Sequence, residues 1–213
     1  GVGSGDLVGI GVGRSVELVV GIIATLRAGA VYVPLDPGYP ALRLQFIVAD
    51  TRLRTILADA RLPRSVSGTL ETIRLDRMDW CEADSSLSDA PASAASRPFA
   101  TASASIDRDA AWVLYTSGST GDPKGAIGRH AAAVNRCEWM WHEYGFGDSD
   151  VFCLRTSPNF IDSVWEILGP LTHGATLRII AECDLADPLR LVDRLAKSDD
   201  GGPVSHVVVV PSL

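Results

Sequence analysis

Apolar runs of strand length alternate with stretches of helical periodicity along most of the chain, and this alternation limits the fold more than any other feature. The predicted strands cover residues 5–12, 31–33, 55–58, 73–75, 111–115, 151–154, 176–180 and 207–210. We expect the last of these to be buried. Strands that alternate with helices favour mostly parallel sheets with helices on their faces, which is a layered α/β fold.

The helical stretches have start and stop signals as well as apolar faces. A first helix follows Ser15 as its N-cap and stops at Gly29, and a second covers residues 40–50. The apolar face of the first helix comprises Val16, Val19, Val20 and Ile23. A later helix has His130, Val134, Cys137, Trp141 and Tyr144 at helical spacing. The last helix opens at residues 187–188, and its inward face comprises Leu189, Val192 and Leu195.

Composition changes once, in the middle of the chain. Residues 82–105 are mostly Ala, Ser, Pro and Asp, which cannot bury enough apolar surface to offset the entropy of an ordered chain. We therefore predict a first α/β part at residues 1–81, an exposed linker at 82–107 and a second α/β part at 108–213.

The overall composition indicates a globular protein and excludes several function classes. The chain has 213 residues, of which 46% are hydrophobic, and a net charge of −7, which argues against a nucleic-acid-binding surface. Its four cysteines are too widely spaced for a zinc site or a disulfide framework. The first residues lack the charged and apolar regions of a signal peptide, and no apolar run approaches the length needed to span a membrane, so we expect a cytoplasmic protein.

The segment that follows the predicted strand at 111–115 has the chemistry of a polyphosphate-binding loop. Four hydroxyls, three glycines and one lysine fall within ten positions: Thr116, Ser117, Gly118, Ser119, Thr120, Gly121, Lys124 and Gly125. Glycines bring backbone N–H groups close to an anion, and hydroxyls donate to phosphate oxygens. This is not a Walker A loop, because Gly125 follows the lysine where that motif has Ser or Thr. The simplest alternative is a solvated turn.

The order of residues in this loop resembles the signature loop of the adenylate-forming superfamily, which includes nonribosomal peptide synthetase adenylation domains, acyl- and aryl-CoA synthetases and luciferases. The resemblance implies that the loop binds the β- and γ-phosphates of ATP. Residues 26–43 are similar to the block AGAxYVPLDPxYPxxR of peptide-synthetase adenylation domains, which favours an amino-acid substrate over a fatty acid or acetate.

A third block, residues 156–171, resembles the segment that lines the acyl pocket in this family, written FDxSVWE. Phe160 and Trp165 match that pattern, but Ile161 stands where the family has the Asp that pairs with the substrate α-ammonium. The carboxylate moves one residue on, to Asp162, a rotation of about 100° on a helix. Our hypothesis is that Asp162 meets an amine placed differently, as in a β-amino acid. The alternatives are that Asp162 or Ser163 caps a helix, and that Trp165 is a packing residue.

The resemblance also implies the reaction and its cofactors. A carboxylate attacks Mg²⁺-bound ATP to give an acyl-adenylate, which the phosphopantetheine thiol of a peptidyl carrier protein captures. The family's magnesium-binding Glu, ribose-binding Asp and mobile lysine lie beyond Leu213, so no catalytic residue is assigned. We expect the chain to be an incomplete N-terminal part of the large domain, inactive by itself. The runner-up is an acyl- or aryl-CoA synthetase, and the third possibility is a non-catalytic nucleotide-binding relic.

Overall fold

The structure is a computed structural model that describes residues 1–68, 70–78, 109–117, 123–197 and 202–209. The chain divides into two compact units. Unit 1 comprises residues 1–13 and 20–113, and unit 2 comprises residues 14–19 and 114–213. The predicted linker at 82–107 lies outside the described residues, so the predicted domain boundaries stay a prediction.

Unit 1 is built on a parallel sheet, as the alternating sequence pattern predicted. Its strands lie in the order β4-β3-β1-β2-β5, and every pairing along this order is parallel. The strands are β1 (Leu7–Gly11), β2 (Val31–Pro34), β3 (Thr55–Ala58), β4 (Glu71–Arg74) and β5 (Ala110–Ser117), of which the last continues into unit 2. The order ends with β6 (Pro123–Arg129), a strand of unit 2 that is paired with β5.

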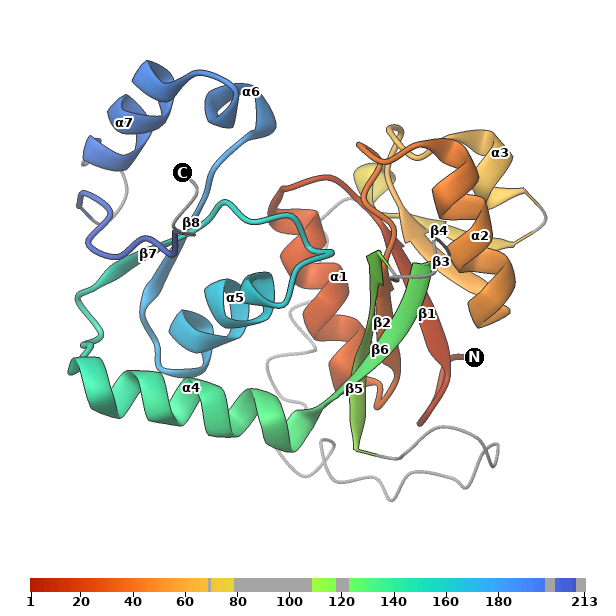
Figure 1. Cartoon of the computed structure of the whole chain (residues 1–213), viewed down its shortest axis with the longest axis horizontal. Helices are drawn as coiled ribbons and strands as arrows, with labels where there is room; N and C mark the ends of the chain where they lie inside the picture. Colours follow the sequence, from red (N-terminus) through yellow and green to blue (C-terminus); the bar gives the residue numbers. More distant parts are fainter. Residues whose placement is uncertain (69, 79–108, 118–122, 198–201, 210–213) are drawn as a thin grey trace. The chain divides into compact units, whose positions relative to one another are not determined.

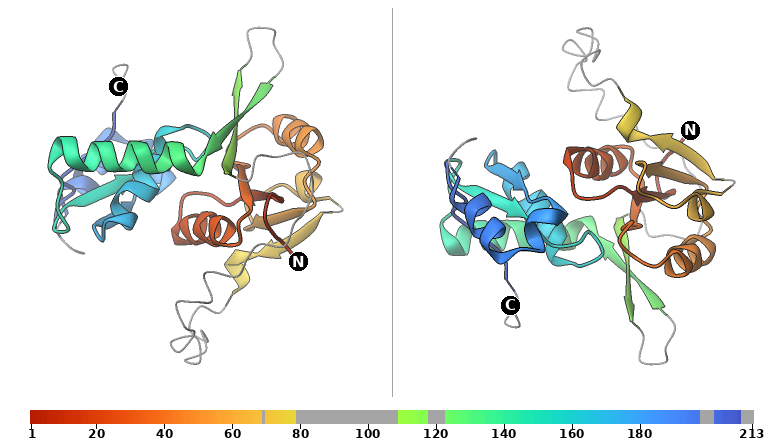
Figure 2. Two further views of the ribbon diagram at one scale, coloured as in Figure 1. Left: turned by 90° about the horizontal axis from the view of Figure 1, so that it is seen from below. Right: turned by 90° about the horizontal axis from the view of Figure 1, so that it is seen from above.

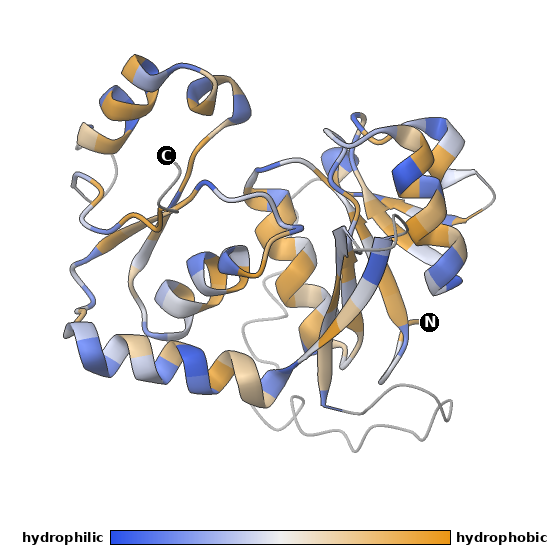
Figure 3. Ribbon diagram, viewed as in Figure 1, coloured by the Kyte–Doolittle hydropathy of each residue, from blue (hydrophilic) through white to orange (hydrophobic). Residues whose placement is uncertain are grey.

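Helices cover both faces of the unit 1 sheet. Helix α1 (Val16–Arg27) lies on one face, whereas α2 (Ala41–Thr51) and α3 (Arg64–Ser67) lie on the other (Figure 2). A 3-10 turn at Leu75–Arg77 follows β4. Hydrophobic residues are concentrated in the central strands and in α1 (Figure 3), and the core includes Ile10, Val33 and Ile56, each 0% exposed. Near-continuous apolar strands suit a parallel sheet that is covered on both sides.

Helix α1 begins and ends as predicted, but its buried face differs. The Ser15 hydroxyl accepts a hydrogen bond from the Leu18 N–H at 3.4 Å, and Gly29 adopts φ 74°, a conformation that favours glycine. Val16 is 65% exposed, because it is the first helical residue and leaves the core face to Leu18 and Ile22. The predicted placement of Val16 on the apolar face is therefore wrong.

Unit 2 contains a second, smaller parallel sheet with helices packed on it. Strand β7 (Val151–Leu154) pairs in parallel with β8 (Thr176–Ile179). The helices are α4 (His130–Tyr144), α5 (Asp162–Thr172), α6 (Glu182–Leu185) and α7 (Pro188–Ala196) (Figure 1). Helices α4 and α5 contact each other, and α5 packs on both strands.

Residues 204–209 run along β7 on the side away from β8. The Ser205 N–H donates to the Val151 carbonyl at 2.8 Å, and His206 forms one parallel bridge with Phe152. Val209 is 64% exposed. The predicted buried strand at 207–210 is therefore wrong for its described residues, because they form no strand and their alternate side chains face outward.

Helix α7 has the predicted cap but not the predicted burial. The Asp187 side chain accepts hydrogen bonds from the N–H groups of Leu189 and Arg190, as its N-cap position predicted. Leu189 is 82% exposed and Val192 64% exposed, so their predicted inward orientation is wrong. No residue of α7 is buried, since no described segment covers its apolar face.

One side chain attaches the end of α7 to the sheet of unit 2. The guanidinium of Arg178, in β8, donates hydrogen bonds to the main-chain carbonyls of Arg194, Lys197 and Gly202 at 2.7–3.2 Å. Carbonyls at a helix C-terminus have no partner within the helix, so a cation is well placed there. Among the described residues, no helix is long and apolar enough to cross a membrane.

Candidate functional site

The structure places the two ends of the predicted phosphate loop at the ends of neighbouring strands. Thr116 and Ser117 are the last residues of β5, and both are exposed after a buried run from Ala110. Lys124 and Gly125 are exposed near the start of β6. The central residues, Gly118, Ser119, Thr120 and Gly121, lie outside the described residues. Four of the eight predicted phosphate ligands therefore lie at the end of β5 or near the start of β6. Contact of these residues with phosphate stays a prediction.

The predicted acyl-pocket residues lie at the start of α5 but do not all face one space. Phe160 and Ile161 are 58% and 57% exposed, and Asp162 is the first, half-buried residue of the helix. Trp165, one turn later, is 5% exposed and lines a cavity of unit 2. The first three residues are not among those that line this cavity.

The interpretation of Asp162 or Ser163 as a helix cap is wrong. Ile161 occupies the N-cap position, and no side chain accepts a hydrogen bond from the first turn. The Ser163 hydroxyl instead donates to the Phe160 carbonyl at 2.7 Å. The Asp162 carboxylate is therefore not engaged in a helix cap.

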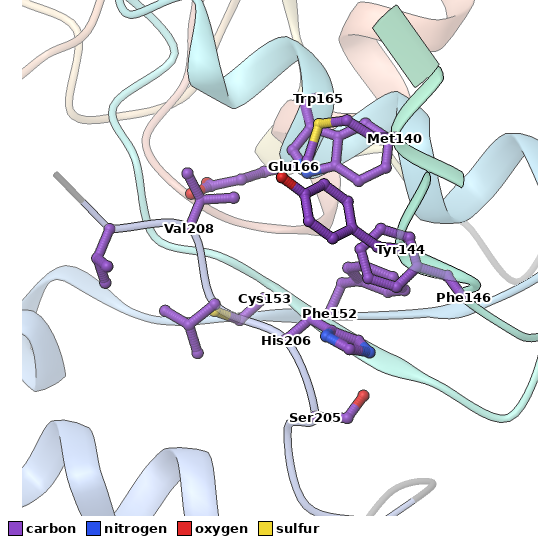
Figure 4. Close-up of a pocket in the computed structure, with 12 residues that line it drawn as sticks. Met140, Tyr144, Phe146, Phe152, Cys153, Trp165, Glu166, Ser205, His206 and Val208 are labelled. Atoms are coloured by element: carbon purple, nitrogen blue, oxygen red, sulfur yellow. The ribbon is translucent and has the colours of Figure 1, made fainter. Parts of the chain in front are cut away.

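The cavity in unit 2 has a volume of about 550 Å³ and is walled by α4, β7, α5 and residues 205–209 (Figure 4). Its lining residues are Met140, Tyr144, Phe146, Phe152, Cys153, Trp165, Glu166, Ser205, His206, Val207, Val208 and Val209. The indole of Trp165 lies along its own helix, since a side chain on Gly169 would overlap the ring. The absence of a side chain at Gly169, one turn later, therefore leaves the room that the Trp165 ring occupies.

Glu166 is the most buried polar residue of the cavity wall, with 1% exposure. One of its carboxylate oxygens accepts the N–H groups of Arg155 and Thr156 at 3.0 and 2.9 Å. The other accepts the Thr156 hydroxyl at 2.7 Å. Three donors on one carboxylate fix the turn after β7, and the Arg155 guanidinium in turn donates to the Val208 carbonyl at 2.9 Å. The network therefore joins α5, β7 and residues 204–209.

Burial governs the titration of the groups in this wall. It raises the pKa of Glu166 above its ordinary value, although the hydrogen bonds from Thr156 and Arg155 act in the opposite direction. It also raises the pKa of Cys153 to about 12 and that of Cys137 to about 11. Both thiols therefore stay protonated at neutral pH and act as packing residues.

A second polar cluster closes the cavity beside Phe146. The Asp150 Oδ1 accepts the Ser205 hydroxyl at 2.9 Å and lies 3.1 Å from the His206 Nε2. The Asp150 Oδ2 accepts the Gly147 N–H at 2.9 Å. Sequence analysis missed this cluster as well as Glu166. The only sequence signal was that Glu166 directly follows Trp165 in the matched block, while Asp150 and His206 are 56 positions apart and belong to no motif.

We expect the contribution of Asp150 to stability to disappear in acid. The Gly147 N–H, followed by the Ser205 hydroxyl and His206, lowers the pKa of Asp150 in the folded state. A lowered pKa stabilises the fold above the unfolded-state value, and this stabilisation is lost as the pH falls through the folded-state value. The difference in unfolding free energy between wild type and Asp150→Asn should therefore shrink from about pH 5 to about pH 2. Urea titrations test this, with Asp148→Asn as an exposed control, and a constant difference would contradict it.

The predicted magnesium ion has no protein-built site in the described part of the chain. Within residues 1–68, 70–78, 109–117, 123–197 and 202–209, no three His, Cys, Asp or Glu side chains form a group that could hold a metal ion. Mg²⁺ commonly binds through one or two carboxylates together with substrate phosphates, so its placement belongs with the nucleotide.

The parallel sheets covered by helices define a layered α/β protein. The chain belongs to the AMP-binding enzyme family, whose sequence profile matches residues 1–213. The resemblance to adenylate-forming enzymes and the predicted fold class are confirmed.

Curated relatives match over the whole chain. Tyrocidine synthase 3 of Brevibacillus parabrevis is 38% identical over 217 residues, which is 100% of this chain and 3% of that protein. Zwittermicin A synthase ZmaJ of Bacillus cereus is 34% identical over 215 residues, which is 100% of this chain and 38% of that protein. The chain thus spans only a minor part of these relatives.

A solved structure shares the fold. The four-domain nonribosomal peptide synthetase holo-AB3403, bound to AMP and glycine, is 26% identical and superposes with a TM-score of 0.74 over 93% of this chain and 14% of that protein. Its nucleotide and amino acid are ligands of that protein.

Proposed function

We propose that the full-length protein to which this chain belongs activates an amino acid as an aminoacyl-adenylate for nonribosomal peptide synthesis. The observation that carries the proposal is the family match over residues 1–213 together with peptide-synthetase relatives that match the whole chain. The acyl- or aryl-CoA synthetase alternative accounts less well for the block at residues 26–43. A relic that binds nucleotide without catalysis would keep the same fold.

The phosphate loop supplies the charge stabilisation in this proposal. The hydroxyls of Thr116, Ser117, Ser119 and Thr120 and the ammonium of Lys124 contact the β- and γ-phosphates of ATP, with backbone N–H groups of Gly118, Gly121 and Gly125 close by. Exposure of Thr116, Ser117 and Lys124 beside one connection supports this, since each is accessible to a ligand. Such groups stabilise negative charge that builds on the phosphates in the transition state.

The reaction needs little covalent work from the protein. A substrate carboxylate oxygen attacks the α-phosphorus of ATP, the bond from that phosphorus to the bridging oxygen breaks, and pyrophosphate leaves with its Mg²⁺. Binding energy serves to align the nucleophile with the α-phosphorus. The phosphopantetheine thiol of a peptidyl carrier protein then displaces AMP. All of these components are consistent with a cytoplasmic enzyme.

The cavity beside Trp165 is the acyl pocket in this proposal, and Asp162 is the partner of the substrate amine. Only Trp165 lines the cavity, but Asp162 is three residues before it on α5, so both side chains can contact one substrate. Because Ile161 occupies the position of the family's Asp, the ammonium group is displaced, which favours a β-amino acid over an α-amino acid.

ATP–pyrophosphate exchange with a panel of α- and β-amino acids tests both levels of the proposal. We expect a β-amino acid to give the highest rate. Asp162→Asn should lower kcat/KM for that substrate by about tenfold to a hundredfold, because a charge-assisted hydrogen bond is lost. Asp193→Asn, an exposed change on α7, is the control.

The outcomes separate the alternatives. A higher exchange rate with α-amino acids than with β-amino acids would contradict the β-amino acid assignment but would still support adenylation. Formation of a CoA ester in preference to loading of a carrier protein would favour the CoA synthetase. No exchange with any amino acid, in a protein that still binds ATP, would favour the relic.

A further inference from the structure

The cavity in unit 2 has an unusually aromatic wall. Phe146 and Phe152 meet edge to face at 5.1 Å between ring centroids, with an interplanar angle of 87°. Trp165 contacts both, at 5.9 and 6.2 Å, and Tyr144 stacks on Phe146 at 5.5 Å. Met140 lies beside the indole of Trp165 (Figure 4), and a thioether next to rings is a soft, adaptable surface. Four ring systems therefore face or border one space.

Three polar side chains in the same wall, those of Glu166, Ser205 and His206, already have partners. Both oxygens of Glu166 accept hydrogen bonds from Arg155 and Thr156. The His206 ring lies against Asp150, and the Ser205 hydroxyl donates to the same carboxylate. A polar group that entered this space would lose its water without gaining these side chains as new partners, which is costly.

We propose that this cavity takes a large apolar group of the substrate, an aromatic ring above all, and rejects small, charged or hydrogen-bonding side chains. The inference rests on the proposed function and names the substrate class of its acyl pocket. A volume of about 550 Å³ is ample for a ring, and it falls in the range of small-molecule pockets. Rings that already meet edge to face offer both edges and faces to a further ring.

Matched substrates test the proposal independently of where the amine lies. ATP–pyrophosphate exchange by the full-length protein should compare phenylalanine, alanine and aspartate, and in parallel 3-amino-3-phenylpropanoate, β-alanine and 3-aminopentanedioate. Within whichever series is active, we expect kcat/KM for the phenyl substrate to exceed that of the other two by at least about tenfold, since burial of a phenyl group has that size of effect. A higher kcat/KM for the small or the acidic member would overturn the proposal.

A variant that fills the cavity gives the complementary result. Val208→Trp should lower kcat/KM for the phenyl substrate by about tenfold or more and leave the KM for ATP unchanged, because the added ring occupies the space meant for the ligand. Val192→Trp, on the exposed face of α7, is the matched control. Equal phenyl activity in wild type and a folded Val208→Trp would count against the proposal.

A binding measurement tests whether the cavity takes an aromatic ring even if Val208→Trp does not fold or if no substrate supports ATP–pyrophosphate exchange. Calorimetry with wild-type protein should show 3-phenylpropanoate binding at least about tenfold more tightly than propanoate, because the two acids differ only in the phenyl group. Equal affinity, or no binding of the phenyl acid, would overturn the aromatic assignment. Tight binding of 3-phenylpropanoate without any exchange activity would refute the proposed adenylation and leave the aromatic cavity standing.

Discussion

Replacing Glu166 with alanine is expected to lower the free energy of unfolding by about 3 kcal/mol, because it removes a buried carboxylate and leaves three partly buried donors without their acceptor. The N–H groups of Arg155 and Thr156 and the Thr156 hydroxyl all lose their acceptor, and a gap opens beside the cavity. Equilibrium unfolding in urea measures the change, and it should appear as a lower midpoint with little change in slope.

Two further variants separate the hydrogen bonds from a general effect of the substitution. Glu166→Gln keeps the size but has one oxygen for three donors, so its loss should fall between wild type and alanine. Glu143→Ala, an exposed glutamate on α4, should change the unfolding free energy by no more than about 0.5 kcal/mol. If Glu166→Ala is as stable as Glu143→Ala, the carboxylate does not hold the turn after β7.

Replacing Lys124 with alanine is expected to lower kcat/KM for ATP by about a hundredfold or more in the full-length protein. The proposed role of the ammonium group is to neutralise charge that develops on the β- and γ-phosphates, and removal of one such group commonly costs this much. The measurement is ATP–pyrophosphate exchange at varied ATP and saturating amino acid. The unfolding free energy should hardly change, since Lys124 is exposed on β6.

The chain offers a matched control for this experiment. Its other lysine, Lys197, pairs with Asp193 at 3.0 Å near the end of α7, and Lys197→Ala should leave ATP kinetics unchanged. Unchanged ATP kinetics in Lys124→Ala would remove that residue from the site. A similar loss in both variants would point to net charge rather than to a phosphate contact.

The strands were the part of the fold that the sequence predicted best. Both β3 and β7 have the predicted bounds, and β2 differs by a single residue. Strands that are covered on both faces must be apolar along their whole length, so short runs rich in Val, Ile and Leu mark them directly. Strand β6 escaped prediction because its sequence, PKGAIGR, is mostly exposed, has no apolar run and contains two glycines.

Helical faces were harder to predict because a pattern shows that an apolar face exists but not what covers it. Leu189 and Val192 are on the same face of α7, as predicted, yet both are exposed. Residues 207–209 have strand composition but form no strand, and the bridge to β7 lies at His206, just before them. In both places the outcome depends on neighbouring segments, which local sequence does not encode.

The candidate site also contains residues that local sequence reveals and residues that only the folded structure brings together. Thr116, Ser117, Lys124 and Trp165 were found because they fall within contiguous motifs. Asp150 and His206 were missed because folding alone brings them together. Glu166 belongs to a matched motif, but its role depends on backbone N–H groups ten and eleven positions earlier, and backbone donors leave no trace in a sequence.

Arg178 has a consequence for protein engineering. Three of its hydrogen-bond acceptors, at residues 194, 197 and 202, are main-chain carbonyls, which any amino acid supplies. We therefore expect the hydrogen bonds from Arg178 to positions 194 and 197 to persist when residues 182–197 are exchanged for those of a relative, as long as the recipient retains this arginine. A junction for such chimeras is best placed just after β8.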